Sequence, residues 1–195
     1  LGCDVVSLDM DYPFTAARAR NAGLQFLLGK YQSIEFIQFV DGDCELNSGW
    51  ITCAYNYLLA NSDYAIACGR RRERFPEQTV FNLLCDIEWN TPVGEAKSCG
   101  GDALIRASAL QDVGGYRDTL IAGEEPEMCF RLRQRNWKIF RLDREMALHD
   151  AAITKFSQWW QRSKRAGYAY AASALLHGCS KERFRVREVF RILFW

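Results

Sequence analysis

The chain has 195 residues, which is enough for one domain with a sizeable core. Hydrophobic residues make up 49% of it and charged residues 25%, the mix of a folded globular domain rather than a disordered segment. The net charge of +1 provides no overall field that would attract nucleic acid, so no nucleic-acid partner is expected. The eight cysteines are scattered and form no Cys-x-x-Cys pair, so the spacing supports neither a zinc motif nor a redox motif and favours a reducing cytosol.

Charge is distributed unevenly along the chain. Eight Lys and Arg residues and two Glu residues lie between Arg162 and Arg191, an excess of +6, whereas the preceding part of the chain is acidic. A basic tail predicts an anionic surface nearby, most simply lipid head groups. No signal peptide and no apolar run of about 18 residues is seen, so we expect a peripheral protein at the cytoplasmic face of a membrane. The expected division is a core at 1–150 and a C-terminal helical region at 151–195.

Strand-like and helix-like segments alternate along the chain. The expected elements, in order, are a strand at 3–8, a helix at 13–31, a strand at 34–40, a helix at 47–61, a strand at 64–69, a helix at 79–89, a strand at 102–106, helices at 107–115 and 124–137, a strand at 138–143 and a long amphipathic helix at 153–176. Thr15 is the expected N-cap of the first helix and Gly29 its stop, and Pro126 is placed as a first helical residue. The apolar strands predict a layered α/β fold with a largely parallel sheet.

Two aspartates, Asp41 and Asp43, directly follow the buried strand at 34–40. Ligands of open parallel sheets bind beyond the carboxyl ends of the strands, where these acids are expected to lie. A calcium loop of the EF-hand type is excluded, because Leu46 and Thr52 occupy the positions that need glycine and an acid. A phosphatase of the haloacid-dehalogenase type also has Asp-x-Asp after a strand, but usually continues with Gly-Thr. A polar turn and a site for a metal that carries phosphate both remain open.

Five motifs in series resemble the family-2 glycosyltransferases of the A-type (GT-A) fold. They are ARARNAG at 17–23, FVDGDCEL at 39–46, GGDALIRASALQDVGGY at 100–116, GEEPEMCFRLRQRNWKI at 123–139 and ALHD at 147–150. The resemblance implies a Rossmann-like, three-layer α/β sandwich with a mixed, mostly parallel sheet. Nothing in the chain corresponds to the family's first, base-binding strands, so the fold is expected to be N-terminally incomplete.

The resemblance implies an inverting enzyme that moves a sugar from a nucleoside diphosphate to an acceptor hydroxyl. The donor is expected to be uridine-linked and the acceptor a glycan or a lipid-linked glycan, in polysaccharide or glycolipid synthesis. The cofactor would be Mn2+ or Mg2+, which stabilises the diphosphate leaving group. By resemblance, Asp43 is the direct metal ligand and His149 the second, while Asp41 faces the ribose or a metal-bound water.

The family's general base corresponds to Glu125, with Glu124 as the alternative. Here Glu-Glu replaces the usual Glu-Asp, so the reach of the base is one methylene longer. Glu125 precedes Pro126 at a helix start, where the helix dipole favours an anion. Enclosure and the neighbouring Glu124 would instead raise its pKa. Ordinary helix electrostatics would explain both acids equally simply.

Further residues are candidates for substrate contacts. Arg20 and Asn21 belong to the donor pocket by resemblance, and Gly101 with Asp102 either lets the backbone approach the donor sugar or forms a simple glycine turn. The basic run at 69–74 is expected to be a solvated loop rather than a phosphate contact.

Aromatic residues of the C-terminal region are candidates for the acceptor. Trp159, Trp160 and Arg162 offer rings and a guanidinium that suit sugars and phosphate, although an amphipathic helix that caps the core explains them as well. Two other hypotheses stay open for the whole chain. One is a metal-dependent phosphatase or nucleotidyl enzyme with Asp41 as nucleophile, and the other is a non-catalytic fragment of a glycosyltransferase.

Overall fold

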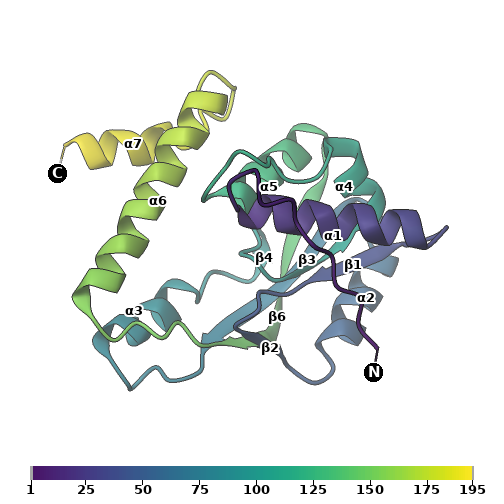
Figure 1. The fold of residues 1–195 in the computed structure, drawn as a ribbon, viewed down its shortest axis with the longest axis horizontal. Coiled ribbons are helices and arrows are strands. Elements are labelled where there is room, and N and C mark those ends of the chain that lie inside the picture. The colour runs from purple at the N-terminus through teal and green to yellow at the C-terminus, as the bar shows by residue number, and fades with distance from the viewer. Residues whose placement is uncertain (1, 195) are drawn as a thin grey trace.

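The structure is a computed structural model that describes residues 2–194. Its elements, in chain order, are α1 (Ala16–Lys30), β1 (Phe36–Phe39), β2 (Cys44–Leu46), α2 (Trp50–Ala60), β3 (Tyr64–Glu73), α3 (Val80–Glu88), β4 (Gly94–Glu95), β5 (Ala103–Arg106), α4 (Ala107–Val113), α5 (Glu124–Gln134), β6 (Lys138–His149), α6 (Phe156–His177) and α7 (Val186–Leu193) (Figure 1). The predicted α/β fold is confirmed.

One mixed sheet forms the centre of the molecule. Its strands follow the order β1-β5-β3-β6-β2, and β4 pairs with β6 off this path. Among the described strands only β3 and β6 pair in parallel, and every other pairing is antiparallel. The expectation of a mostly parallel sheet is therefore wrong, because β5 runs opposite to both of its neighbours. A strand that is covered on both faces is apolar on both faces, whether its neighbours are parallel or antiparallel. The apolar pattern in the sequence therefore indicated that the strands are buried, but not the relative direction of neighbouring strands.

Helices cover both faces of the sheet, which gives the expected layers. α2 packs on β3, β5 and β6, whereas α4 contacts β5, α5 contacts β6, and α1 packs on α5. The inner face of α2 carries Trp50, Ala54 and Leu58, all fully buried and spaced four residues apart, as a helix buried along one side requires. This core holds the strand ends that carry the candidate site.

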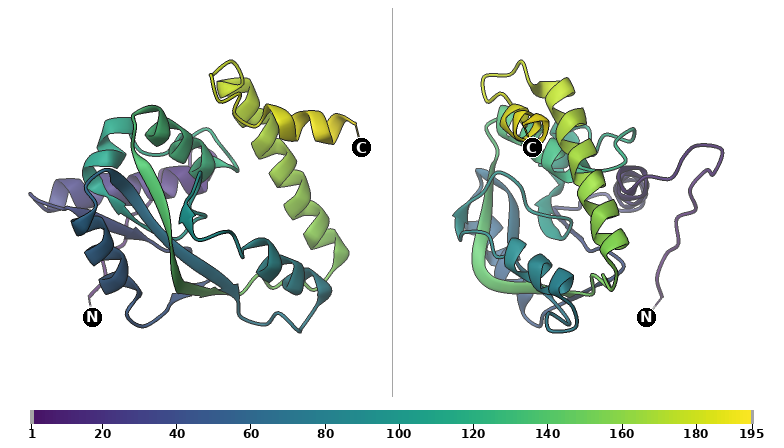
Figure 2. Two further views of the ribbon diagram at one scale, coloured as in Figure 1. Left: turned by 180° about the vertical axis from the view of Figure 1, so that it is seen from behind. Right: turned by 90° about the vertical axis from the view of Figure 1, so that its left-hand side faces the viewer.

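The C-terminal helices lie at the edge of the molecule. Figures 1 and 2 show α6 standing apart from the sheet, from the side of α3 to the side of α5, with α7 folded back against it. Trp159 stacks on Phe81 of α3 at one end of α6, and His177 contacts Glu127 of α5 at the other, with 2.8 Å between Nε2 and Oε1. Within residues 2–194 no helix is both long and apolar enough to cross a bilayer. The division at residue 150 stays a prediction.

Several boundaries differ from those expected at the N-terminus. Residues 3–8 form no strand, and Val5 is 85% exposed, because no described strand lies beside this segment to pair with it. Thr15 is confirmed as the N-cap of α1. Gly29 does not end that helix, which continues to Lys30.

The two longest strands extend further than predicted. β3 reaches Glu73 and β6 reaches His149, because the two strands pair along their whole length with local register shifts. The basic run at 69–74 therefore lies mostly within the sheet and not in a solvated loop, so that prediction is wrong. In α5, Pro126 is the third helical residue and not the first.

Gly69 in β3 allows a close approach of the neighbouring strand and of Trp50, and its substitution should be costly. A Cβ at this position would lie 2.7 Å from the Arg144 carbonyl oxygen and 2.7 Å from the Trp50 ring. We expect Gly69→Ala to lower the free energy of unfolding by about 1–3 kcal/mol, the usual cost of overpacking. Gly29→Ala, which meets open space on α1, is the matched control and should raise it by about 0.5–1 kcal/mol. Urea unfolding of both variants measures this, and equal stability of the two would contradict the packing described.

Candidate active site

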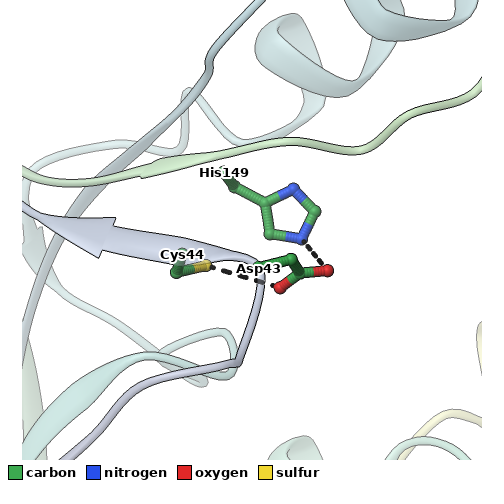
Figure 3. A group of neighbouring side chains, drawn as sticks. All are labelled: Asp43, Cys44 and His149. Carbon is green, nitrogen blue, oxygen red and sulfur yellow. Dashed lines mark hydrogen bonds and ion pairs between the residues drawn. The ribbon is translucent and has the colours of Figure 1, made fainter.

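The turn between β1 and β2 brings Asp43 beside His149. In the pairing of β2 with β6, Cys44 lies opposite His149, the last residue of β6. This register places the Asp43 Oδ2 atom 3.3 Å from the His149 Nε2 atom (Figure 3). The side chain of Asp43 is 56% exposed, so the pair is open to a ligand from solvent.

His149 has the environment of a neutral imidazole. Burial lowers its pKa, the positive charge of Arg71 lowers it further, and Asp43 acts in the opposite direction with a smaller effect. Its Nδ1 atom is buried without a hydrogen-bond partner in the described chain, and the Trp89 ring meets the imidazole edge-on at 4.8 Å. Neutral imidazole is the form that binds metals.

Asp41 is held by charged partners on three sides. Its Oδ1 atom lies 2.5 Å from Arg20 Nη2, and its Oδ2 atom lies 3.5 Å from Arg71 Nη2. Its backbone N–H donates to Asp102 Oδ1 at 2.8 Å, and Asp102, fully buried, is itself paired with Arg71 at 3.0 Å. Asp41 is thus neutralised within the protein, whereas the Asp43 carboxylate has no guanidinium partner in residues 2–194.

Gly101 makes the approach of Asp41 possible. The register of β1 on β5 sets Phe39 opposite Ala103, which brings the Gly-Gly-Asp segment against the aspartate turn. A Cβ at Gly101 would overlap the Asp41 carboxylate. The close approach at this glycine is therefore to Asp41, and the expected approach of the backbone to a donor sugar stays a prediction.

Arg20 links the aspartate turn to the start of α5. Besides Asp41, it contacts Glu124, whose Oε1 atom lies 2.5 Å from Arg20 Nη1. Burial alone would lower the pKa of Arg20, but the two carboxylates outweigh it and the pKa is raised. Arg20 therefore stays charged, and Glu124 is occupied by it.

Glu125 is the enclosed acid of the pair. Its side chain is 6% exposed, and its Oε1 atom accepts hydrogen bonds from the Cys99 N–H at 2.6 Å and from the thiols of Cys99 and Cys129 at 3.1 and 2.9 Å. It lines a pocket of about 200 Å³ together with Arg71 and Trp89. A carboxylate fixed beside a pocket is the arrangement that a general base needs.

The other predicted contacts lie apart from this pocket. Asn21 uses its amide on the backbone of Tyr116, accepting its N–H at 2.8 Å and donating to its carbonyl at 2.7 Å, and so holds the loop before α5. Trp160 is half exposed and stacks on Phe156, while Trp159 packs on α3. Arg162 pairs with Glu88 at 2.8 Å, and Glu88 does line the pocket.

Three residues of this site were not predicted individually: Arg71, Trp89 and Cys99. Arg71 lies in the run 69–74. Extending the strand predicted at 64–69 through this run would have placed Arg71 near the carboxyl end of that strand. Cys99 immediately precedes the Gly-Gly-Asp segment, but nothing in the local sequence indicates its contact with α5. Trp89 directly follows α3, a helix that no motif connects to the site.

The residues present fit a divalent metal at Asp43 and His149. The pair offers a carboxylate oxygen and an imidazole nitrogen 3.3 Å apart with open access, and oxygen ligands suit Mn2+ and Mg2+. The neighbouring Cys44 thiol is a soft ligand and does not compete for hard ions such as Mn2+ and Mg2+. Asp41 is already paired with Arg20, so it fits a contact with a metal-bound water or the ribose better than direct coordination of the metal.

Comparison with known proteins gives a distant curated relative. No protein-family model matches the chain. The pre-mycofactocin glycosyltransferase of Mycobacterium tuberculosis, strains CDC 1551/Oshkosh and H37Rv, is 22% identical over 186 residues. The match covers 90% of this chain but only 38% of the relative's length.

Solved structures of glycosyltransferases share the fold at low identity. The mannosyltransferase PcManGT of Pyrobaculum calidifontis, in complex with GDP-Man and Mn2+, has a TM-score of 0.60 at 14% identity, over 88% of this chain and 46% of that one. Glucosyl-3-phosphoglycerate synthase of M. tuberculosis, with Mn2+ and UDP-glucose, has a TM-score of 0.53 at 13% identity, over 84% and 56%. TarS 1–349 of S. aureus has a TM-score of 0.52 at 13% identity, over 83% and 44%. The chain therefore has the GT-A glycosyltransferase fold.

The lowered pKa of His149 can be measured directly. The chain has two histidines, so proton NMR titration with His149→Asn for assignment gives its pKa, which we expect below the ordinary value of about 6.5. Since the unfolded chain then binds the proton more readily, the free energy of unfolding should fall as the pH drops from about 6.5 through the lowered pKa. His149→Asn should reduce that slope. A pKa of 6.5 or above would mean that pairing with Asp43 outweighs burial.

Proposed function

We propose that the chain is the catalytic part of a metal-dependent, inverting glycosyltransferase of the family-2 kind. The observation that carries this proposal is the open Asp43–His149 pair, which lies on a GT-A fold and is connected through Asp41, Arg20 and Glu124 to the helix that carries the enclosed Glu125. Fold neighbours bound to Mn2+ with GDP-Man or UDP-glucose support a nucleoside-diphosphate sugar as donor. Uridine diphosphate is our first choice of carrier.

The donor would bind across the aspartate turn. Asp43 and His149 would hold Mn2+ or Mg2+, which, when bound, neutralises the charge that the diphosphate gains as its bond to the sugar breaks. Asp41, held by Arg20, would face the ribose or a water of the metal. Gly101 would lie near the donor sugar, whereas Asp102 is fully buried and would act only through Arg71, its ion-pair partner, which adds a positive charge at the same edge.

Glu125 would act as the general base. The acceptor oxygen forms a bond to the anomeric carbon while its proton passes to the Glu125 carboxylate. The bond from the anomeric carbon to the diphosphate oxygen breaks, and the nucleoside diphosphate leaves with the electron pair. A single displacement of this kind inverts the anomeric configuration.

The structure disfavours the phosphatase hypothesis. A nucleophilic Asp41 would need a free carboxylate oxygen, but its two oxygens face the guanidinium groups of Arg20 and Arg71. The hypothesis of a non-catalytic fragment is more serious, because the chain spans 38% of the length of the curated relatives that it matches. Measurement of nucleotide binding distinguishes a catalytic chain from a non-catalytic fragment.

We further propose that the C-terminal region lies on the inner face of a membrane and that the acceptor is a glycan or a lipid-linked glycan. The basic residues between Arg162 and Arg191 would attract anionic lipid at about 1 kcal/mol each near the surface. Apolar side chains of α7 and the residue after it are exposed next to them: Phe190, Ile192, Leu193 and Phe194. An amphipathic helix of this composition suits the interface.

Isothermal titration with UDP, GDP, ADP and CDP, each with and without Mn2+, tests the donor site. We expect Mn2+-dependent binding of UDP ahead of the others, and a loss of at least about tenfold in affinity in Asp43→Ala because the metal loses its oxygen ligand. Glu45→Ala removes a neighbouring exposed acid and is the matched control. Unchanged affinity in Asp43→Ala would refute the metal role, and no binding of any nucleotide would favour the non-catalytic fragment.

Glu125→Gln tests the base in a preparation that transfers sugar. The amide keeps the size of the side chain but cannot take a proton, so kcat should fall by about 10² or more while donor affinity is retained. Glu124→Gln weakens only the contact with Arg20 and should cost less than about tenfold. If Glu124→Gln alone shows the large loss, the base is Glu124.

Sedimentation with liposomes tests the membrane contact. The protein should sediment with anionic vesicles, less with neutral ones, and less again in high salt, because salt screens the attraction of the basic residues. Leu193→Ser combined with Phe194→Ser should weaken binding, whereas Ile51→Ser, an exposed apolar position on α2, should not. Equal recovery in the supernatant with both lipids would exclude the interfacial helix.

A further inference from the structure

Two cysteines that are distant in sequence meet at the proposed base. Cys99 precedes β5 and Cys129 lies on α5, one turn after Glu125, and all three side chains are at least nine-tenths buried. Their Sγ atoms are 3.8 Å apart. Both thiols contact the same Glu125 oxygen, and burial raises the pKa of Cys129 to about 12, so these thiols are protonated donors in the metal-free protein.

The two Sγ atoms and the Glu125 Oε1 atom are separated by nearly the distances of a tetrahedral metal site. Zn–S bonds of about 2.3 Å and Zn–O bonds of about 2.0 Å place two sulfur ligands about 3.8 Å apart and sulfur and oxygen about 3.5 Å apart. The sulfur separation in the structure is already 3.8 Å, and the sulfur–oxygen separations are 3.1 and 2.9 Å. The Glu125 oxygen would move by about half an ångström as its two thiol hydrogen bonds are replaced by a bond to the metal.

The pocket beside the cluster provides entry and a fourth ligand. Cys99 and Glu125 both line the pocket of about 200 Å³, from which a water can complete the tetrahedron. Two thiolates and one carboxylate around a dication carry one net negative charge. Arg71 and Arg141 line the same pocket, and Arg141 is 5% exposed with an Nε atom that lacks a partner in the described chain. These cations compensate the charge of an occupied site.

We propose that Cys99, Cys129 and Glu125 form an inhibitory site for a thiophilic divalent cation such as Zn2+. On binding, each thiol gives its proton to solvent, and the ion is held by two thiolate sulfurs, one Glu125 oxygen and a water from the pocket. Thiolates select Zn2+ over Mn2+ and Mg2+, so the site is distinct in chemistry from the Asp43–His149 pair. The effect on activity rests on the proposed function, because the bound ion would occupy the group that takes the acceptor's proton.

Cobalt substitution detects the site without any assay of transfer. Co2+ bound to thiolates gives an intense near-ultraviolet charge-transfer absorption, which we expect to saturate at one equivalent in the wild-type protein and to disappear on addition of Zn2+. Cys99→Ser and Cys129→Ser should each reduce the absorption by more than half and weaken Co2+ binding at least tenfold. Cys44→Ser is the matched control, since Cys44 also lies beside a carboxylate and His149, and it should leave the absorption unchanged.

Two outcomes of this experiment overturn the proposal. One is the absence of thiolate absorption in the wild-type protein, and the other is its loss in Cys44→Ser with retention in Cys129→Ser. Because a buried Cys→Ser change can destabilise the fold, 113Cd NMR of the unmodified protein provides a second reading. A resonance in the range of two sulfur ligands with oxygen supports the site, and one in the all-oxygen or nitrogen–oxygen range refutes it.

An activity arm separates this proposal from the proposed function. Micromolar Zn2+ should inhibit Mn2+-supported sugar transfer in the wild type and in Cys44→Ser, and at least tenfold more weakly in Cys129→Ser. Cobalt–thiolate absorption without any transfer would retain the metal site and refute the proposal that this chain is catalytic. Transfer with equal Zn2+ sensitivity in the wild type and Cys129→Ser would refute the inhibitory role alone.

Discussion

The candidate site depends on the charge of Arg20. This one guanidinium lies 2.5 Å from a carboxylate oxygen of Asp41 and 2.5 Å from one of Glu124, with its side chain only 14% exposed. The pairs are partly buried, so loss of one carboxylate would leave the guanidinium without a full complement of charge, and the three groups constrain one another. Because they come from α1, the turn after β1 and the start of α5, the ion pairs fix the distance between the proposed donor site and the proposed base.

The two aspartates of the Asp-x-Asp motif lie in different environments. Asp41 points into a network with Arg20, Arg71 and Asp102, whose charges are compensated within the protein. Asp43, two residues later and half exposed, meets a single neutral imidazole and is available to a metal. The same local sequence thus contains one acid that is paired within the protein and one that is open to a ligand, because β1 pairs with β5 on one side of the turn while β2 pairs with β6 on the other.

The sequence predicted those parts of the molecule that depend on local patterns. The N-cap Thr15, the strand before Asp41 and the helix that carries Glu125 all follow from composition and spacing. The resemblance of five motifs to a known family singled out His149 as a candidate metal ligand. The direction of β5 and the inward position of Arg71 depend on pairings between distant strands, which periodicity does not encode. The meeting of Cys99 with Cys129 is of the same kind: their spacing matches no metal motif, and only the packing of α5 against the loop before β5 brings the thiols together.

The proposed mechanism requires that Asp43 and His149 hold a metal that also binds a diphosphate. Electron–nuclear double resonance of Mn2+ bound with UDP tests this most directly, because it detects nuclei within bonding distance of the ion. We expect a 31P coupling from the diphosphate and a 14N coupling that is lost in His149→Asn while the 31P coupling remains. A Mn2+ spectrum with phosphorus coupling but no nitrogen coupling in the wild-type protein would remove His149 from the site, and the absence of both couplings would refute a metal-bound diphosphate at Asp43 and His149.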